Sequence, residues 1–139
     1  MSKTERVGIS LDERLLSQFD KLITNQNYTN RSEAIRDLIR KSLSEQELAK
    51  PTTKAVAGIF LVYDHHSMSL SQKLTDLQHH YLIQIISTIH VHLDHGNCLE
   101  IIILKGRVKD IENISNKIIS LKGVKLSRVN VLTTGEKLT

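Results

Sequence analysis

The sequence predicts an α+β chain of two parts, a βαα unit followed by a βαββαβ domain. Three observations support this. A short alternating segment precedes two helical patterns in the first third of the chain. The only proline, Pro51, lies in a polar stretch between a helical pattern and a strand pattern. Six further elements follow that stretch. We therefore expect an N-terminal unit over residues 1–48, a linker over 49–54 and a second domain over 55–139.

The first unit begins with a strand from Arg6 to Leu11, in which apolar and polar residues alternate. Asp12 then precedes a helical pattern and is the expected cap of the first helix. The segment from Asn30 to Glu33 has the spacing of a capping box and should begin the second helix. The apolar faces of the two helices are Leu15, Leu16, Phe19, Leu22 and Ile23, and Ala34, Ile35, Leu38, Ile39 and Leu43.

This unit needs a partner. A unit of about fifty residues buries too little surface to be comfortably stable alone, and its one strand has nothing to pair with. A second copy of the chain would supply both an antiparallel strand and a shared core, so we expect an intertwined dimer. The paired strands would place Val7, Ile9 and Leu11 against the helices, with Arg6, Gly8 and Ser10 facing outward.

A two-stranded ribbon fits the major groove of DNA, where Arg6 can bond guanine and Ser10 can bond a base edge. The start of the second helix, at Asn30, Arg31 and Ser32, offers free backbone N–H groups to a phosphate. The alternative is an ordinary edge strand with a polar face, followed by an ordinary capped helix. The net charge of +4 is compatible with a polyanionic partner but does not establish one.

The second domain should contain strands over residues 55–63, 85–93, 98–104 and 124–132, with helices over 68–82 and 108–121. This order of elements is that of the ferredoxin-like, or split βαβ, fold. The chain has one cysteine, which excludes an intramolecular disulfide and suits a reducing compartment. Its first residues lack the apolar run of a signal peptide, and no apolar stretch approaches the roughly 20 residues of a membrane span. We expect a cytoplasmic protein without a membrane partner.

All seven histidines and the only cysteine lie between His65 and Cys98. Imidazole and thiolate bind borderline and soft transition metals. His90 and His92 are two residues apart in a strand and share one face, and the hairpin loop after them brings Cys98 into the same volume. A fourth ligand could come from His79. The spacing does not say whether that histidine belongs to the same subunit.

Several functions remain compatible with this metal site. A catalytic zinc site would need an open position and a general base, and Glu100 could be that base or could orient a ligand histidine. Tetrahedral His/Cys sites select zinc, whereas square-planar sites rich in nitrogen select nickel or copper. The residues alone therefore allow a metal-responsive repressor that answers to nickel, copper or zinc, a metal-storage or metallochaperone module, or, less readily, a metallohydrolase.

Two sets of motifs resemble known families. The segment from Tyr28 to Leu38, together with Arg6–Leu11, resembles the ribbon-helix-helix repressors. The motifs Ser87–His92, Cys98–Glu100 and Leu104–Gly106 resemble the regulatory domain of the nickel-responsive repressors, the NikR family. The resemblance covers nearly the whole chain. The resemblance implies that the protein is a repressor and not an enzyme. Such a repressor would bind a palindromic operator when loaded with Ni(II) and control nickel uptake genes.

The resemblance also implies a homotetramer, a dimer of dimers joined through ACT-type domains, with planar Ni(II) between them. His90, His92 and Cys98 would be ligands from one subunit, and His79 would come from its neighbour. Gln78 and Glu100 match residues that support the ligands. Glu33 and Asp37 match a further cation site, although they could equally form a solvated helix face.

The chain departs from the family pattern at two places. Gly8 stands where a polar side chain usually projects toward DNA, and Ser67 and Met68 replace a basic pair that contacts DNA in some relatives. The remaining histidines are expected to be exposed, or to form weaker metal sites. They are His65, His66, His80 and His95.

Overall fold

The computed structural model describes residues 3–139 and divides into two compact units. The first unit extends to Lys41, and the second covers Ser42–Thr139. Across the described residues, no helix is both long enough and apolar enough to cross a membrane.

The first unit contains helix α1 (Glu13–Asn25) and most of helix α2 (Arg31–Leu48). The Leu15 N–H donates to Asp12 Oδ1 at 2.9 Å, which confirms the expected cap of α1. Residues 3–12 form neither helix nor strand in the single chain. The strand expected at Arg6–Leu11 is therefore not formed here, because a strand needs a hydrogen-bonded neighbour and this chain supplies none.

Few apolar side chains of the first unit are buried. Ile23 and Ala34 are the buried apolar residues among those described in this unit. Side chains from the extended segment and from both helices are exposed instead: Val7, Ile9, Leu11, Leu15, Leu22, Leu38 and Ile39. The apolar faces predicted from the sequence exist, but within one chain they lie open to solvent.

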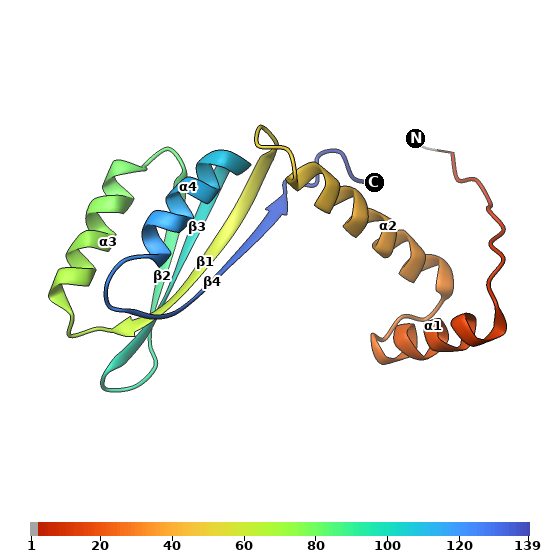
Figure 1. Ribbon diagram of the computed structural model, residues 1–139, viewed down its shortest axis with the longest axis horizontal. Helices are drawn as coiled ribbons and strands as arrows, with labels where there is room; N and C mark the ends of the chain where they lie inside the picture. Colours follow the sequence, from red (N-terminus) through yellow and green to blue (C-terminus); the bar gives the residue numbers. More distant parts are fainter. Residues whose placement is uncertain (1–2) are drawn as a thin grey trace. The chain divides into compact units, whose positions relative to one another are not determined.

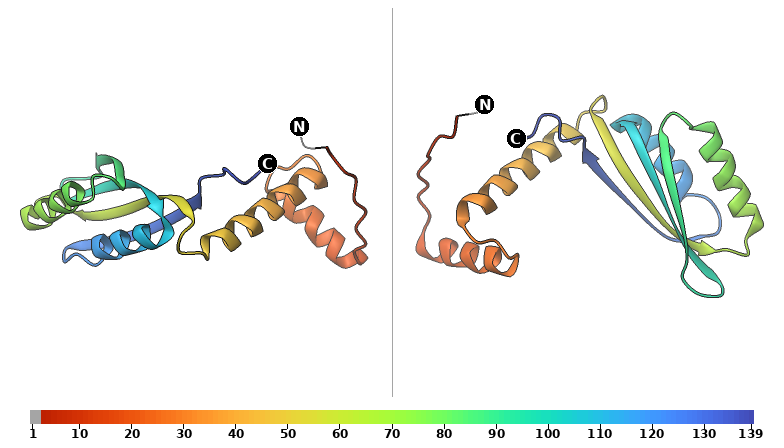
Figure 2. Two further views of the ribbon diagram at one scale, coloured as in Figure 1. Left: turned by 90° about the horizontal axis from the view of Figure 1, so that it is seen from above. Right: turned by 180° about the vertical axis from the view of Figure 1, so that it is seen from behind.

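The second unit has the expected βαββαβ order (Figure 1). Its elements are β1 (Lys54–Asp64), α3 (Met68–His80), β2 (Ile85–His92), β3 (Asn97–Arg107), α4 (Val108–Ile119) and β4 (Val124–Thr133). The strands lie in the order β2-β3-β1-β4, and every neighbouring pair is antiparallel (Figure 2). Both helices end two residues earlier than the periodicity predicts, because short turns follow them.

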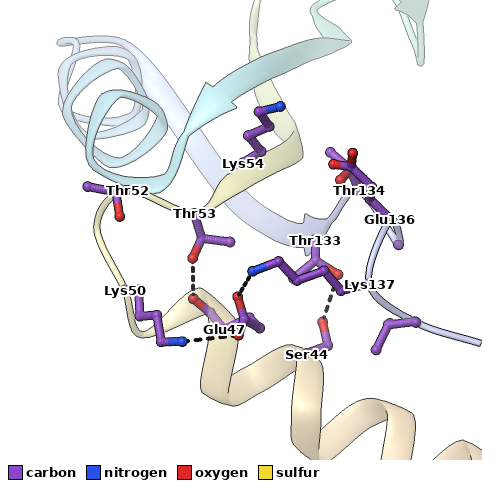
Figure 3. Close-up of a pocket in the computed structure, with 12 residues that line it drawn as sticks. Ser44, Glu47, Lys50, Thr52, Thr53, Lys54, Thr133, Thr134, Glu136 and Lys137 are labelled. Atoms are coloured by element: carbon purple, nitrogen blue, oxygen red, sulfur yellow. Dashed lines mark hydrogen bonds and ion pairs between the residues drawn. The ribbon is translucent and has the colours of Figure 1, made fainter.

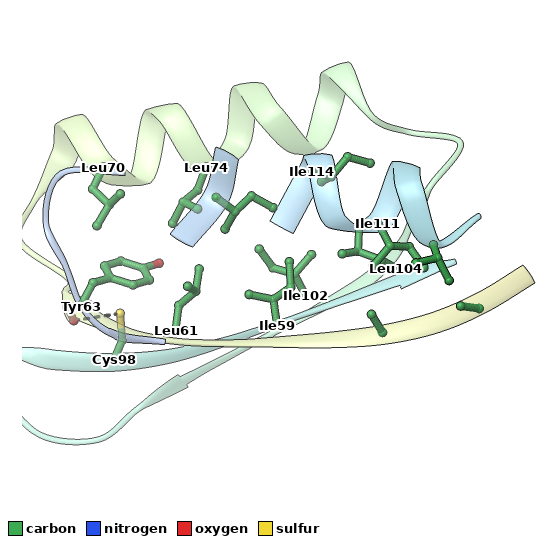
Figure 4. Packing of buried hydrophobic residues seen from close by; sticks show 14 residues of the cluster. Ile59, Leu61, Tyr63, Leu70, Leu74, Cys98, Ile102, Leu104, Ile111 and Ile114 are labelled. Carbon is green, nitrogen blue, oxygen red and sulfur yellow. Dashed lines mark hydrogen bonds between the residues drawn. The ribbon is translucent and has the colours of Figure 1, made fainter. Parts of the chain in front are cut away.

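The core of this unit lies between the sheet and the two helices, which cover the same face (Figure 4). Ile59 and Leu61 of β1 and Ile102 and Leu104 of β3 are completely buried. The helices contribute Leu70, Leu74, Ile111, Ile114 and Ile118 to the same cluster. Alternate residues of β1 and β3 face this core, so their neighbours must face the opposite, uncovered side of the sheet.

The segment before β1 is held by the second unit. Leu48, the last residue of α2, packs against the core, and Thr53 donates its hydroxyl to the Glu47 carbonyl at 2.6 Å. The carbonyls of Pro51 and Thr53 accept the first backbone N–H groups of α4 at 3.0 and 2.9 Å. The compact units thus divide at Lys41, before the end of α2, because its last turn packs on the second unit. The boundary at residue 48 remains a prediction from the sequence.

Candidate metal site and DNA-binding residues

The β2–β3 hairpin places the predicted ligands on one face of the sheet. In its register His92 is opposite Cys98, and His90 is opposite Glu100. Directly opposed residues of an antiparallel pair project to the same side. Since Cys98 and Glu100 are buried under the helices, both histidines project toward that helix-covered side. Their rings lie 5.1 Å apart, centroid to centroid.

The hairpin loop has a local cause. Asp94 Oδ1 accepts the backbone N–H groups of Gly96 and Asn97 at 2.8 and 2.7 Å. An aspartate that bonds the backbone two and three residues ahead fixes a tight turn. The turn returns the chain so that β3 begins at Asn97 and Cys98 reaches its position opposite His92.

The thiol of Cys98 is completely buried and directs its sulfur to the Tyr63 carbonyl oxygen at 3.5 Å. Burial raises the pKa of the Cys98 thiol, because the charged form loses hydration. Metal binding requires the thiolate, so coordination by Cys98 would be coupled to release of a proton.

A hydrogen-bond network centred on the buried Glu100 lies beside the predicted ligands. Glu100 accepts from the Tyr63 hydroxyl at 2.6 Å and from the Gln78 amide at 2.9 Å. Burial also raises the pKa of Tyr63, so its hydroxyl keeps its proton and donates it in this bond. The carboxylate opposite His90 is thus fixed by β1 and by α3. Both oxygens of Glu100 have a protein donor, an arrangement typical of a positioning group rather than a general base.

Tyr63 is the one member of this network that the sequence reasoning missed. Its only signal was its place at the inward-facing end of a strand. The register of β1 with β3, which sets Tyr63 opposite Cys98, is a long-range property that local spacing does not reveal.

His79, the fourth predicted ligand, lies on α3 next to Gln78. Gln78 continues the inward stripe of Leu70 and Leu74 at four-residue spacing, and the next residue is rotated away from it by about 100°. His79 is accordingly exposed, and among the described residues it belongs to no group of three candidate ligands whose donor atoms lie within 4.8 Å of one another. This position leaves it available to another subunit.

The donor types of the predicted ligands fit a transition-metal ion, although the donor atoms of His90, His92 and Cys98 do not all lie within 4.8 Å of one another in the single chain. Two imidazoles and a thiol face one side of a short hairpin, which is a donor set for zinc, nickel or copper. In the described part of the chain, the group of three candidate ligands within 4.8 Å of one another is Asp64, His65 and His66. The His65 ring also lies 5.4 Å from that of His92, and its buried Nδ1 has no hydrogen-bond partner.

The predicted DNA-binding residues lie on the extended N-terminal segment and at the start of α2. Arg6, Gly8 and Ser10 are exposed on the extended segment. Asn30 caps α2, since its Oδ1 accepts the Glu33 N–H at 2.9 Å, and Ser32 is exposed in the first turn. These positions leave the helix N-terminus open to an anion.

Arg31, by contrast, is already paired. Its Nε and an Nη donate to the two carboxylate oxygens of Asp20, each at 2.8 Å. This bond holds the pKa of Asp20 below its usual value. A phosphate would have to share or displace that carboxylate.

The side chain of Glu33 does not complete the expected capping box. Its carboxylate pairs with Arg36 and lies 3.9 Å from Arg40, because these arginines are one and two turns further along the same helix face. Asp37 accepts from the Tyr28 hydroxyl and from Arg40, both at 2.6 Å. The cation site predicted at Glu33 and Asp37 is thus lined by carboxylates that already have protein partners.

Comparison with known proteins agrees with both halves of this description. The ribbon-helix-helix protein family, copG type, matches residues 5–46. The NikR C-terminal nickel-binding domain matches residues 56–132, which is more than half of the chain. The chain belongs to the NikR family. NikR proteins are nickel-responsive transcription regulators and not enzymes, and their metal is Ni(II).

The similarity extends over the full length of the relatives. A nickel-responsive regulator of Solibacter usitatus is 47% identical over 138 residues, covering 99% of both chains. Those of Geotalea uraniireducens and Nitratidesulfovibrio vulgaris are each 49% identical, over 138 and 140 residues, and cover 99% and 100% of both chains. A solved ACT domain from a GTP pyrophosphokinase of Chlorobium tepidum matches 56% of this chain and all of its own, with 15% identity and a TM-score of 0.45.

Proposed function

We propose that this NikR protein binds a palindromic operator when loaded with Ni(II) and represses nickel uptake genes in the cytoplasm. The observation that carries the proposal is the β2–β3 register, which sets two histidines and the cysteine on one face of the sheet, beside the helix that bears Gln78 and His79.

His90, His92 and Cys98 of one subunit and the partner subunit's His79 hold the metal. When bound, nickel supplies strong bonds to imidazole and thiolate donors of both subunits at once. Glu100 orients the hairpin and, through Gln78, fixes the part of α3 that precedes His79. Tyr63 holds the second oxygen of Glu100. Loading the site therefore restrains α3 relative to the sheet.

The assembly is a homotetramer, a dimer of dimers. Two exposed apolar surfaces support this. In the first unit, Val7, Ile9 and Leu11 lie open until a second copy covers them. In the second unit, the face of the sheet away from the helices carries Phe60, Ile89, Val91 and Leu126, each at least 37% exposed. Apolar surface of this kind is typical of contacts between subunits.

In the dimer, paired extended segments read the major groove through Arg6, Gly8 and Ser10, while Asn30, Arg31 and Ser32 bind a phosphate at the start of α2. Gly8 contributes backbone rather than a side chain. Loading then selects arrangements in which both ribbons meet half-sites of one operator. To shift the ratio of DNA-competent to other arrangements from about 1:99 to 99:1, nickel must bind the DNA-competent arrangement more tightly by roughly 5.5 kcal/mol.

The test is operator affinity with and without nickel, for the native chain, for His90→Ala and for His95→Ala. His95 lies in the hairpin loop and is exposed, so it is a matched control that also removes an imidazole. We expect nickel to tighten binding of the native chain and of the control by 100-fold or more, on the order of 3 kcal/mol, and to leave His90→Ala unchanged. Equal tightening of all three proteins would contradict the proposed site. Absorption by a square-planar nickel–thiolate centre would further distinguish nickel from zinc.

A further inference from the structure

The net positive charge of this protein comes from residues outside its ribbon-helix-helix unit. Residues 1–48 contain eight Lys and Arg and eight Asp and Glu, so that part is neutral. Residues 49–139 contain eleven basic and seven acidic residues, and carry the whole net charge of +4. Affinity for DNA comes largely from basic groups that neutralise phosphates. The regulatory domain therefore supplies the excess of basic groups that could neutralise phosphates.

Five of those eleven basic residues gather at one end of the sheet. Lys54 begins β1 and is directly opposite Arg107 at the end of β3. Lys105 lies two residues before Arg107 and so shares its face. Lys50 and Lys109 join them because the Lys109 N–H bonds the Pro51 carbonyl at 3.0 Å. All five are exposed. We call Lys50, Lys54, Lys105, Arg107 and Lys109 the linker-end patch.

Few acidic side chains neutralise the positive charges of the linker-end patch. Figure 3 shows Lys50 and Lys54 beside a pocket of about 430 Å³, in which the Glu47 carboxylate pairs with Lys50 at 3.1 Å and with Lys137 at 3.3 Å. No carboxylate of residues 3–139 pairs with the other four patch residues, although Asp110 and Glu136 lie in neighbouring segments. Like charges directly opposed across two strands are destabilising, so Lys54 and Arg107 carry a cost that an anion would remove.

We propose that the linker-end patch binds backbone phosphates of the same DNA duplex that the ribbon-helix-helix unit holds. This inference rests on the proposed function. The chain itself favours DNA over other polyanions, because the patch and the DNA-binding unit belong to one continuous chain. A duplex held by the ribbon-helix-helix unit is therefore tethered to the patch and present at raised local concentration around it. Contacts of this kind position the protein without reading sequence.

The test compares two charge-matched double variants of the nickel-loaded full chain. Lys54→Gln with Arg107→Gln removes two patch cations. Lys73→Gln with Lys122→Gln removes two exposed cations located elsewhere, on α3 and after α4. Affinity for the operator and for an unrelated duplex is measured between 50 and 200 mM salt.

We expect the patch variant to lower the slope of log affinity against log salt by about 1.8, which is two contacts at roughly 0.9 each. The loss of affinity should be equal on both duplexes, and nickel affinity and the thermal midpoint should not fall. The control variant should keep the native slope. A patch variant whose slope matches that of the control would overturn the proposal. The unrelated duplex gives this answer even if nickel fails to tighten operator binding, an outcome that would contradict the proposed function instead.

Discussion

The two units of this chain are incomplete in different ways. The regulatory domain buries a full core of its own, with Ile59, Leu61, Ile102 and Leu104 sealed between sheet and helices. The ribbon-helix-helix unit buries little and exposes the apolar side chains of its extended segment and helices. Conversely, the metal site that we propose for the regulatory domain takes His79, an exposed residue of α3, from a second subunit. On the proposed assembly, the first unit requires a partner subunit to fold, and the second requires one to complete its metal site.

This difference separates two kinds of stability. Unfolding of the regulatory domain should depend on its own packing and hence little on protein concentration. Unfolding of the first unit should depend on dimerisation, so its midpoint should rise with concentration. Four variants test this contrast and the site that depends on it.

The largest effect is expected from Ile102→Ala. Ile102 is completely buried, so its truncation leaves a cavity and should cost about 2–5 kcal/mol in the free energy of unfolding. Denaturant unfolding followed in the regulatory domain measures this loss, and dilution should not change it. A loss that grew on dilution would show that this core also depends on association.

Ile9→Ala makes the same truncation at a residue that is 62% exposed in the single chain. If the ribbon forms between two chains, Ile9 becomes buried, and the cost should be about 1.5–3 kcal/mol per side chain. Sedimentation and unfolding at several concentrations measure it. An effect below 0.5 kcal/mol, the usual size for a surface substitution, would mean that Ile9 stays exposed and that any dimer forms through a surface other than the ribbon.

Tyr63→Phe removes one donor to Glu100 and leaves the shape of the core nearly unchanged. Loss of a hydrogen bond that orients a metal-site residue typically costs 10–100-fold in metal affinity. We expect weaker nickel binding of that order, measured by competition with a chelator. Tyr81→Phe is the control, because the Tyr81 hydroxyl bonds Lys117 on the surface instead. Nickel affinity lowered equally by both changes would assign the effect to general destabilisation.

The smallest effect is expected from Asp20→Asn, which releases Arg31 from its paired carboxylate. Affinity for any duplex should rise by roughly twofold, since one more cation can meet a phosphate. The Arg31 bond lowers the pKa of Asp20, so the native pair persists at neutral pH and is lost only as the pH falls through that lowered pKa. The gain from the substitution should therefore be constant between pH 6 and 8. A gain that varied over this range would implicate another group.

The sequence by itself determined the order of the elements from α1 to β4, the cap of α1 and the types of side chain in the predicted metal site. These follow from periodicity and spacing within a few residues, where the backbone geometry of a helix or a strand fixes which side chains share a face. The His90–Val91–His92 spacing is of this kind. The motifs that resemble the NikR family supplied the identity of the metal, which spacing alone left open.

Only the tertiary structure decided which residues of distant elements lie next to one another. The register between β1, β2 and β3 sets Tyr63 beside Cys98 and Glu100, and His65 near His92. The packing of the two helices of the first unit pairs Arg31 with Asp20, eleven residues away. The backbone bonds that gather the linker-end patch join segments more than fifty residues apart in the chain. Such contacts depend on how distant elements pack together, and no local pattern of residues encodes that packing.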